Sequence, residues 1–266
     1  MYREELKRIA KRVASKVSLK LVSPLIKPAV EAILDANAKS IPRMSQLRAL
    51  ETTADFVNAH MRELQSFPDT FSLLEHVLPM VKRAPGLICE FGVFKGRSLN
   101  FIASRIPSPI CGFDSFEGLP EDWWDGVPRG TFRVDRLPSV ASNVELVKGW
   151  FDQTLPPFLA THAGDALFLH IDSDLYSSAK TVFDNLAPRI KPGTIIAFDE
   201  YFNYPGWEFG EHRAFQESVE KYGWEFKYLG YTPRTEQVAV EITRVNECGP
   251  SLQDPKPRRP PSRPRG

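Results

Sequence analysis

The stretch at residues 87–98 combines an apolar run with an acid and two glycines, and reads Leu-Ile-Cys-Glu-Phe-Gly-Val-Phe-Lys-Gly-Arg-Ser. Gly92 and Gly96 remove side chains where a ligand must approach the backbone. A helix that begins near Arg97 directs its free N–H groups toward the same turn. Asp114 ends the next apolar run, about 20 residues after the first glycine, where a carboxylate can accept hydrogen bonds from ribose hydroxyls. These residues predict a nucleoside-type cofactor site at the carboxyl end of a parallel sheet.

The elements that must position this site alternate between strand and helix from Gly86 onward. The patterns predict strands over 86–93, 109–114, 144–148, 166–172, 193–199, 224–231 and 237–243, and helices over 97–105, 151–161, 178–189 and 210–222. Five strands in alternation with helices indicate a doubly wound parallel sheet, and a closing pair joined by a short turn indicates an antiparallel edge. We therefore predict an α/β fold with a seven-stranded, mostly parallel sheet and an antiparallel C-terminal hairpin.

Two terminal segments lie outside this alternation. Residues 1–80 predict a helical N-terminal extension, and residues 248–266 are rich in proline and arginine, which predicts a disordered tail. The catalytic domain is therefore expected over residues 81–247. In the extension, helices are expected from a cap at Ser45 through Ala59, and from a cap at Asp69 or Ser72 through Val81.

The composition excludes several classes of protein. The chain has 266 residues, of which 42% are hydrophobic and 25% charged, as in an ordinary globular protein. Its net charge of +1 gives no argument for a nucleic-acid partner, although residues 1–27 carry +6 and the tail from Lys256 carries +5. Three widely spaced cysteines without a CxxC motif favour a reducing cytoplasm. No run reaches the roughly 20 apolar residues that span a bilayer, and the basic N-terminus lacks the features of a signal peptide.

Residues 3–20 place basic and apolar side chains at helical spacing. This pattern fits a packing helix with a solvated face, and it also fits a membrane-surface contact or a dimer arm. A homo-oligomer is therefore one expectation for this chain.

Three longer blocks stand out beside the first motif. They read Gly-Phe-Asp-Ser-Phe-Glu-Gly-Leu-Pro at 112–120, His-Ile-Asp-Ser-Asp-Leu-Tyr-Ser-Ser at 170–178 and Phe-Asp-Glu-Tyr-Phe-Asn-Tyr-Pro-Gly-Trp at 198–207. Together and in order, these blocks resemble the macrocin/mycinamicin-type sugar O-methyltransferases, a subfamily of the class I S-adenosylmethionine-dependent methyltransferases. The first motif, Glu90-x-Gly92-x-x-x-Gly96, fits this class and does not fit the GxGxxG pattern of dinucleotide-binding enzymes. The resemblance covers roughly residues 50–243.

The resemblance implies an Mg²⁺-dependent enzyme that methylates a hydroxyl, usually on a deoxysugar. Asp172, Asp199 and Glu200 match the metal-binding acids of the family, and Asp174 occupies a position proposed for a general base. The family often has two aspartates where this chain has Asp199-Glu200. The resemblance also implies a class I Rossmann-like fold, in which the segment after the third strand, Lys148-Gly149-Trp150, lies near the adenine.

The residues themselves support this chemistry. Carboxylates at the ends of adjacent parallel strands converge on one crevice, and oxygen ligands suit Mg²⁺. A bound divalent ion lowers the pKa of a sugar hydroxyl, and Asp174 or His170 can then remove its proton. Plainer interpretations are also open. Asp172 and Asp174 can be polar residues at the end of a strand, with Asp174 capping the next helix. His170 can be a hydrogen-bonded core residue.

The expected site residues fall into three groups. Glu90 either caps a turn or contacts the methionine moiety or its loop, and the aromatic side chain of Trp150 either stacks on adenine or packs in the core. Loops 115–140 and 201–212 are expected to select the acceptor. The cofactor-binding residues are expected to be Glu90, Gly92, Gly96, Ser98, Asp114, Ser115, Lys148, Gly149, Trp150 and Asp172; the metal ligands Asp172, Asp199 and Glu200; and the catalytic residues Asp174 and His170.

These observations predict a cytoplasmic, Mg²⁺-assisted O-methyltransferase that acts on a sugar hydroxyl of a natural product or saccharide, with S-adenosylmethionine as cofactor. One alternative is methylation of a catechol-like small acceptor, whose hydroxyl a bound metal ion would activate in the same way. Another is a non-catalytic adaptor that uses the methyltransferase fold and the basic termini to hold a partner. That alternative requires broken cofactor or metal residues, whereas all of them are present.

Overall fold

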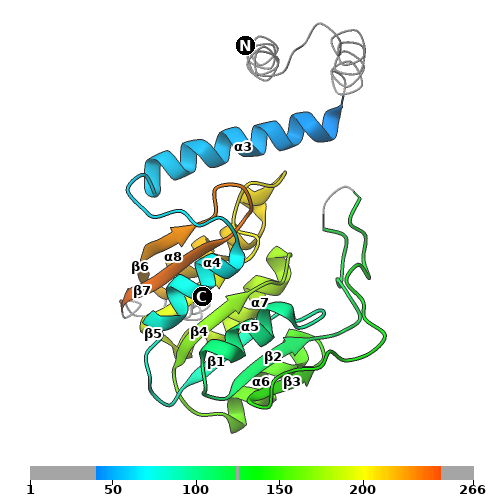
Figure 1. The fold of residues 1–266 in the computed structure, drawn as a ribbon, viewed down its shortest axis with the longest axis vertical. Helices are drawn as coiled ribbons and strands as arrows, with labels where there is room; N and C mark the ends of the chain where they lie inside the picture. Colours follow the sequence, from blue (N-terminus) through cyan, green and yellow to red (C-terminus); the bar gives the residue numbers. More distant parts are fainter. Residues whose placement is uncertain (1–39, 124–125, 247–266) are drawn as a thin grey trace, which may run out of the picture. The chain divides into compact units, whose positions relative to one another are not determined.

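A computed structural model describes residues 40–123 and 126–246, whose arrangement is shown in Figure 1. The predicted basic helix over 3–20 and the predicted tail lie outside the described residues. The helices are α3 (Ile41–His60), α4 (Thr70–Val77), α5 (Arg97–Arg105), α6 (Phe151–Thr161), α7 (Tyr176–Leu186) and α8 (Glu211–Tyr222), with 3₁₀ turns η1 (Leu78–Met80), η2 (Ala187–Arg189) and η3 (Trp207–Phe209). The strands are β1 (Leu87–Phe91), β2 (Ile110–Asp114), β3 (Val144–Lys148), β4 (Ala166–Ile171), β5 (Ile190–Phe198), β6 (Trp224–Tyr231) and β7 (Val238–Val245).

The strands of the described part form one seven-stranded sheet in the order β3-β2-β1-β4-β5-β7-β6. Strands β1 to β5 pair in parallel, and β7 pairs antiparallel with both β5 and β6. The predicted doubly wound α/β fold with an antiparallel C-terminal hairpin is therefore confirmed. The strand order reverses between β1 and β4, and ligands of open α/β sheets bind at the carboxyl edge beside such a reversal.

Both faces of the sheet are covered by helices, because the central strands bury side chains in both directions (Figure 1). Phe91 and Ile171 face one core, which also contains buried side chains of α6, α7 and α8. Ile88 and Phe168 face the other core, together with α4 and α5. Every residue of β1 and β4 is buried. The strand ends are therefore held rigidly, which fixes the residues that follow them.

Some predicted boundaries were wrong by a few residues. The helix expected from Ser45 begins at Ile41, because Ser40 Oγ accepts a hydrogen bond from the Arg43 N–H and Pro42 suits a first turn. The helix expected over 178–189 begins at Tyr176 and gives way to a 3₁₀ turn after Leu186. The expected cap at Asp69 is confirmed, since its carboxylate accepts the Ser72 N–H at 2.8 Å.

By packing, the chain divides into two compact units, Met1–Arg48 and Ala49–Gly266. The sheet and the helices that cover it belong to the second unit, and α4 packs there against α5, β6 and β7. Among the described helices, none combines the length and the apolar character that crossing a bilayer requires.

Candidate active site

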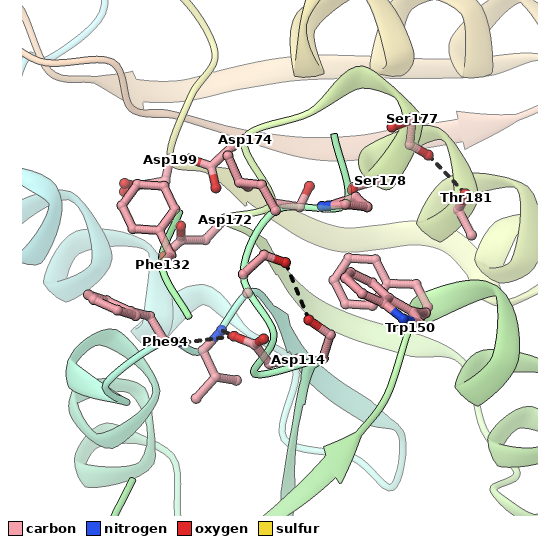
Figure 2. A pocket seen from close by; sticks show the side chains of 18 of the residues that line it. Phe94, Asp114, Phe132, Trp150, Asp172, Asp174, Ser177, Ser178, Thr181 and Asp199 are labelled. Atoms are coloured by element: carbon pink, nitrogen blue, oxygen red, sulfur yellow. Dashed lines mark hydrogen bonds between the residues drawn. The ribbon is translucent and has the colours of Figure 1, made fainter. Parts of the chain in front are cut away.

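A cavity of about 610 Å³ opens at the carboxyl edge of the sheet, where the strand order reverses (Figure 2). Its walls come from the turns that follow β1, β2, β3, β4 and β5, and from the first turns of α5, α6 and α7. Ten of the predicted site residues line it: Gly92, Ser98, Asp114, Ser115, Gly149, Trp150, Asp172, Asp174, Asp199 and Glu200. Glu90, Gly96, Lys148 and His170 do not.

Gly92 is required by a neighbouring backbone rather than by a ligand alone. Its φ is +98°, and a Cβ atom at this position would overlap the carbonyl oxygen of Asp172. Gly96 is the N-cap of α5, with φ +72°, and a Cβ there would press on Pro138. The two glycines therefore let the turn after β1 pack against the turn after β4 and against the long loop. Our expectation that both make room for a ligand was incomplete.

Asp114, at the end of β2, organises the turn after β1. Its Oδ2 accepts hydrogen bonds from the N–H groups of Val93 and Phe94, both at 2.8 Å. Its Oδ1 accepts the Phe116 N–H at 2.6 Å. The carboxylate thus links the turns after β1 and β2, and it also lines the cavity. Each carboxylate oxygen has more than one lone pair, so these bonds leave acceptor capacity for a ligand hydroxyl.

The remaining wall near Asp114 is formed by Ser115 and by the segment after β3. Ser115 Oγ accepts the Glu117 N–H at 3.0 Å and shapes the start of the long loop. Gly149 and Trp150 line the cavity, whereas the exposed side chain of Lys148 does not. Trp150 lies on the other side of the cavity from Phe94 in Figure 2, where its indole ring presents a large apolar surface.

Three carboxylates gather where β4 and β5 end. Asp172, Asp199 and Glu200 each offer an oxygen within 4.8 Å of the others. Burial, together with the charges of Asp199 and Glu90, raises the pKa of Asp172 well above its usual range. Burial and the charges of Asp174 and Asp199 do the same for the pKa of Glu200.

This donor set fits a hard divalent cation. All the ligand atoms are carboxylate oxygens, and Glu200 Oε2 is buried without a hydrogen-bond partner in the described part of the chain. Buried acids that repel one another are stabilised by a cation between them. Thr70 Oγ1 lies 3.5 Å from Asp199 Oδ1, and Gln237 Nε2 donates to the Asp199 carbonyl at 3.2 Å. These contacts orient Asp199 toward the other two acids.

Asp174 lines the same cavity from a constrained turn. Its φ of +62° is in the left-handed region, and the Leu175 N–H bonds to the Ser173 carbonyl at 2.6 Å. The predicted cap role was wrong, because α7 has Leu175 at its N-cap and no side-chain cap bond. Burial and the charges of Asp199, Glu236 and Asp114 raise the pKa of Asp174 to about 7.

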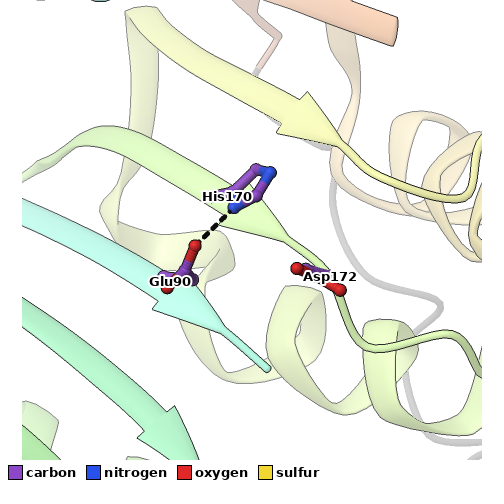
Figure 3. A group of neighbouring side chains, drawn as sticks. All are labelled: Glu90, His170 and Asp172. Carbon is purple, nitrogen blue, oxygen red and sulfur yellow. Dashed lines mark hydrogen bonds and ion pairs between the residues drawn. The ribbon is translucent and has the colours of Figure 1, made fainter. Parts of the chain in front are cut away.

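Glu90 and His170 form a buried pair beside Asp172 (Figure 3). His170 Nδ1 lies 2.7 Å from Glu90 Oε1, and both residues are almost completely inaccessible. Burial opposes a charge on His170, but the hydrogen bond to Glu90 and its charge outweigh this and raise the pKa of His170. Neither residue lines the cavity. The plainer interpretation of His170, a hydrogen-bonded core residue, therefore describes its position.

One further acid at this site, Glu211, was not predicted. Glu211, the first residue of α8, is fully buried, and its Oε1 accepts both the N–H and the hydroxyl of Ser173 at 3.0 Å. Burial raises the pKa of Glu211 more than these bonds lower it. Glu211 thus holds the turn between Asp172 and Asp174. An acid at the start of a helix is common, so the role of Glu211 is revealed only by its contact with Ser173, which lies 38 residues earlier in the sequence.

Trp207 lies in the loop at 201–212, which was also predicted to select the acceptor. Its side chain is 3% exposed, its Nε1 donates to Thr52 Oγ1 at 3.0 Å, and its ring packs on Phe56. It is therefore a core residue under the loop at 201–212 rather than part of an open substrate wall.

Comparison with known proteins gives a family for the central part of the chain. Residues 89–201 match the family described as a methyltransferase domain. A relative from Streptomyces olivaceus, named 8-demethyl-8-(2,3-dimethoxy-alpha-L-rhamnosyl)-tetracenomycin-C 4'-O-methyltransferase, is 29% identical, over 44% of this chain and 53% of its own. Demethyldecarbamoylnovobiocin O-methyltransferase from Streptomyces niveus is 27% identical, over 46% of this chain and 55% of its own.

The chain thus spans about half the length of the curated relatives it matches. Among solved structures, that of the calicheamicin methyltransferase CalS11 is 26% identical, covers 64% of this chain and 75% of its own, and superposes with a TM-score of 0.49. The matched residues run from β1 to the turn after β5 and include the strand-order reversal and the cavity beside it. Residues 89–201, which match a methyltransferase domain, thus form the part of a seven-stranded, class I Rossmann-like sheet that carries the cavity.

Proposed function

We propose that this protein transfers a methyl group from S-adenosylmethionine to a hydroxyl of a small acceptor, a sugar ring on a natural product or saccharide, with the help of Mg²⁺. One observation carries the proposal: a single cavity joins Asp114 and Trp150 on one side to Asp172, Asp199 and Glu200 on another. The first pair suits a nucleoside, and the three acids suit a cation that holds a hydroxyl.

The cofactor half is assigned to the turns after β2 and β3 and to Gly92 in the turn after β1. Asp114 keeps acceptor capacity for ribose hydroxyls, and the indole ring of Trp150 offers a face for adenine. Bound S-adenosylmethionine supplies an electrophilic methyl group on a cationic sulfur. The acids that line the cavity favour a cation there, so the charge of the site agrees with this ligand.

The acceptor half is assigned to the ends of β4 and β5. Asp172, Asp199 and Glu200 would hold Mg²⁺, which when bound lowers the pKa of an acceptor hydroxyl and fixes its oxygen. Asp174 lines the cavity two residues after Asp172, and this position supports it as the group that takes the hydroxyl proton. His170 is a weaker candidate, because it is buried against Glu90 outside the cavity.

The reaction needs no covalent intermediate on the protein. With both substrates bound, the walls of the cavity would hold an acceptor oxygen against the methyl group and would lower the barrier chiefly by proximity and orientation. Glu211 supports this alignment because it fixes Ser173, and with it the turn that carries Asp172 and Asp174. The names of the relatives, a rhamnosyl-tetracenomycin and a novobiocin-precursor O-methyltransferase, support a hydroxyl acceptor of the sugar-bearing class.

A methyl-transfer assay tests the proposal. The protein is incubated with methyl-labelled S-adenosylmethionine, Mg²⁺ and either methyl α-L-rhamnopyranoside or the planar 3,4-dihydroxybenzoate. We expect label on the rhamnoside, lost with EDTA and in Asp172→Asn, and retained in Asp55→Asn, whose side chain is exposed on α3. Preferential labelling of dihydroxybenzoate would replace the sugar by a catechol-like acceptor. Labelling of neither compound would contradict the proposal.

A further inference from the structure

Two phenylalanines present their rings at the wall of the cavity. Phe94 lies in the turn after β1, and Phe132 lies in the long loop between β2 and β3. Phe94 is 36% exposed and Phe132 is 41% exposed, which is unusual for side chains of this size. Their ring centroids are 5.5 Å apart and their planes meet at 72° (Figure 2). The two rings therefore form an open corner rather than a slot.

Both residues have a backbone conformation that disfavours a side chain. The φ angles are +48° at Phe94 and +69° at Phe132, in the left-handed region that costs free energy for residues other than glycine. Phe116 has a similar φ of +60°, but its ring is 5% exposed and packs in the core with Val93 and Leu99. Burial offsets the strain at Phe116. No comparable burial offsets it at Phe94 and Phe132.

The corner is held in place by bonds on both sides. The Phe94 N–H donates to Asp114 Oδ2 at 2.8 Å. Phe132 is flanked by Thr131 and Arg133, whose N–H groups donate to the carbonyls of Pro128 and Gly130 at 3.1 and 3.3 Å. Strained residues that persist in a fixed position next to a cavity are typical of ligand-binding sites. The rings are thus preorganised for a contact that the protein alone does not make.

We propose that Phe94 and Phe132 form the subsite for the acceptor ring, and that this ring is a sugar in its chair form. This inference rests on the proposed function and deepens it. Two aromatic planes at 72° offer one face and one edge to a bound ring, and the open corner leaves room for the thickness of a puckered ring. The corner belongs to the same cavity as the carboxylates, so a ring seated on it can present a hydroxyl to Asp172 and Asp174.

The cofactor is a less suitable occupant of this corner. Trp150 lies on the other side of the cavity in Figure 2, and Asp114, the residue assigned to ribose, lies between it and Phe94 in that view. A nucleoside on Asp114 and Trp150 therefore extends away from the two phenylalanines. Lys95 Nζ lies 4.8 Å from the Phe94 ring centroid, so a cation already occupies part of one side of this ring. What remains is an apolar surface suited to the C–H groups of a sugar.

The direct test is saturation-transfer NMR with methyl α-L-rhamnopyranoside and the full chain loaded with S-adenosylhomocysteine. Irradiation of the aromatic protein protons is expected to saturate the ring C–H protons of the rhamnoside. The signal is expected to fall about two- to tenfold in Phe94→Ala and in Phe132→Ala, since each aromatic contact contributes on this scale. Phe132→Tyr keeps the ring and should keep the signal. Phe209→Ala, which removes a 69% exposed ring outside the cavity, is the matched control.

Calorimetric titration of S-adenosylhomocysteine separates this inference from the proposed function. A wild type that binds S-adenosylhomocysteine but shows no saturation of the rhamnoside overturns the inference and leaves the methyltransferase proposal standing. Equal signals in the wild type and in both alanine variants also overturn it. A folded wild type that does not bind S-adenosylhomocysteine contradicts the proposed function instead. In the transfer assay, the alanine variants should raise the KM for the rhamnoside more than they lower kcat.

Discussion

Replacement of Asp114 by alanine is expected to weaken both the fold and the binding of S-adenosylhomocysteine. The carboxylate accepts three backbone N–H groups, those of Val93, Phe94 and Phe116, at 2.6 to 2.8 Å. Each lost bond costs about 1 kcal/mol at this partly solvated position, so the free energy of unfolding should fall by about 3 kcal/mol. For a domain of this size, that corresponds to a melting temperature lower by roughly 6–12 °C.

The same substitution removes the acceptor assigned to the ribose hydroxyls. Two hydrogen bonds to a charged group are together worth about 3 kcal/mol or more, so the affinity should fall at least about 100-fold. Asp114→Asn separates the two roles, because the amide oxygen still accepts an N–H while the charge is lost. We expect Asp114→Asn to recover about half of the lost stability but little of the affinity.

The measurements are differential scanning calorimetry and isothermal titration with S-adenosylhomocysteine at a temperature where every variant is folded. An unchanged melting temperature in Asp114→Ala would refute the structural role that we assign to the three N–H bonds. An unchanged affinity in a folded Asp114→Ala would refute the assignment of this residue to the ribose.

Three other predictions concern the acids and the first glycine. In EDTA, the free energy of unfolding measured in urea should fall as pH rises from about 4 to 7. The reason is that Asp174 and Glu236, whose pKa values are both raised to about 7, bind protons when folded that they release when unfolded. For Asp174 the loss is about 4 kcal/mol, and a flat or rising pH profile would contradict this prediction. Glu211→Leu should lower the free energy of unfolding by about 2–4 kcal/mol in urea titrations. Glu211→Gln should lower it by less, because the glutamine keeps an acceptor for the turn after β4. Equal losses in the two variants would argue against this contact. Gly92→Ala should abolish S-adenosylhomocysteine binding in calorimetry whereas Gly126→Ala, with a similar φ but open space around it, should not; retained binding in Gly92→Ala would show that the two turns can separate.

Much of the fold could be predicted because its strands have an unambiguous pattern. Strands β1 and β4 are short apolar runs that end in a glycine or an acid, as buried parallel strands do. The bounds of α5, α6 and β3 agree with the prediction. The start of α3 was wrong because two serines, at 40 and 45, could each serve as its cap. Only the backbone geometry decides between them.

The residues that follow the strands could be predicted as a group, since parallel strands bring their carboxyl ends to one edge. The contacts among them could not. Glu90 and His170 are 80 residues apart, and nothing local shows that they form a buried hydrogen-bonded pair. Glu211 reaches Ser173 across 38 residues, for the same reason. Pairings of this kind depend on strand order and helix placement, which set distances that no short segment encodes.

The aromatic corner formed by Phe94 and Phe132 could not be predicted from the sequence, for a different reason. Phe94 lies inside the glycine motif, whose glycines carry the sequence signal, and Phe132 lies in a loop without a regular pattern. Exposed position and a positive φ are properties of the backbone path, and neither can be read from residue type. A phenylalanine in a sequence predicts burial by default, so its exposure beside a cavity becomes informative only once the structure is known.

The most direct test of the central claim is a calorimetric titration of S-adenosylhomocysteine into the unmodified protein. The account predicts binding at one site per chain with a dissociation constant in the micromolar range. Absence of binding heat across a range of temperatures, from a protein that retains a cooperative melting transition, would contradict the assignment of the cavity beside Asp114 to S-adenosylmethionine.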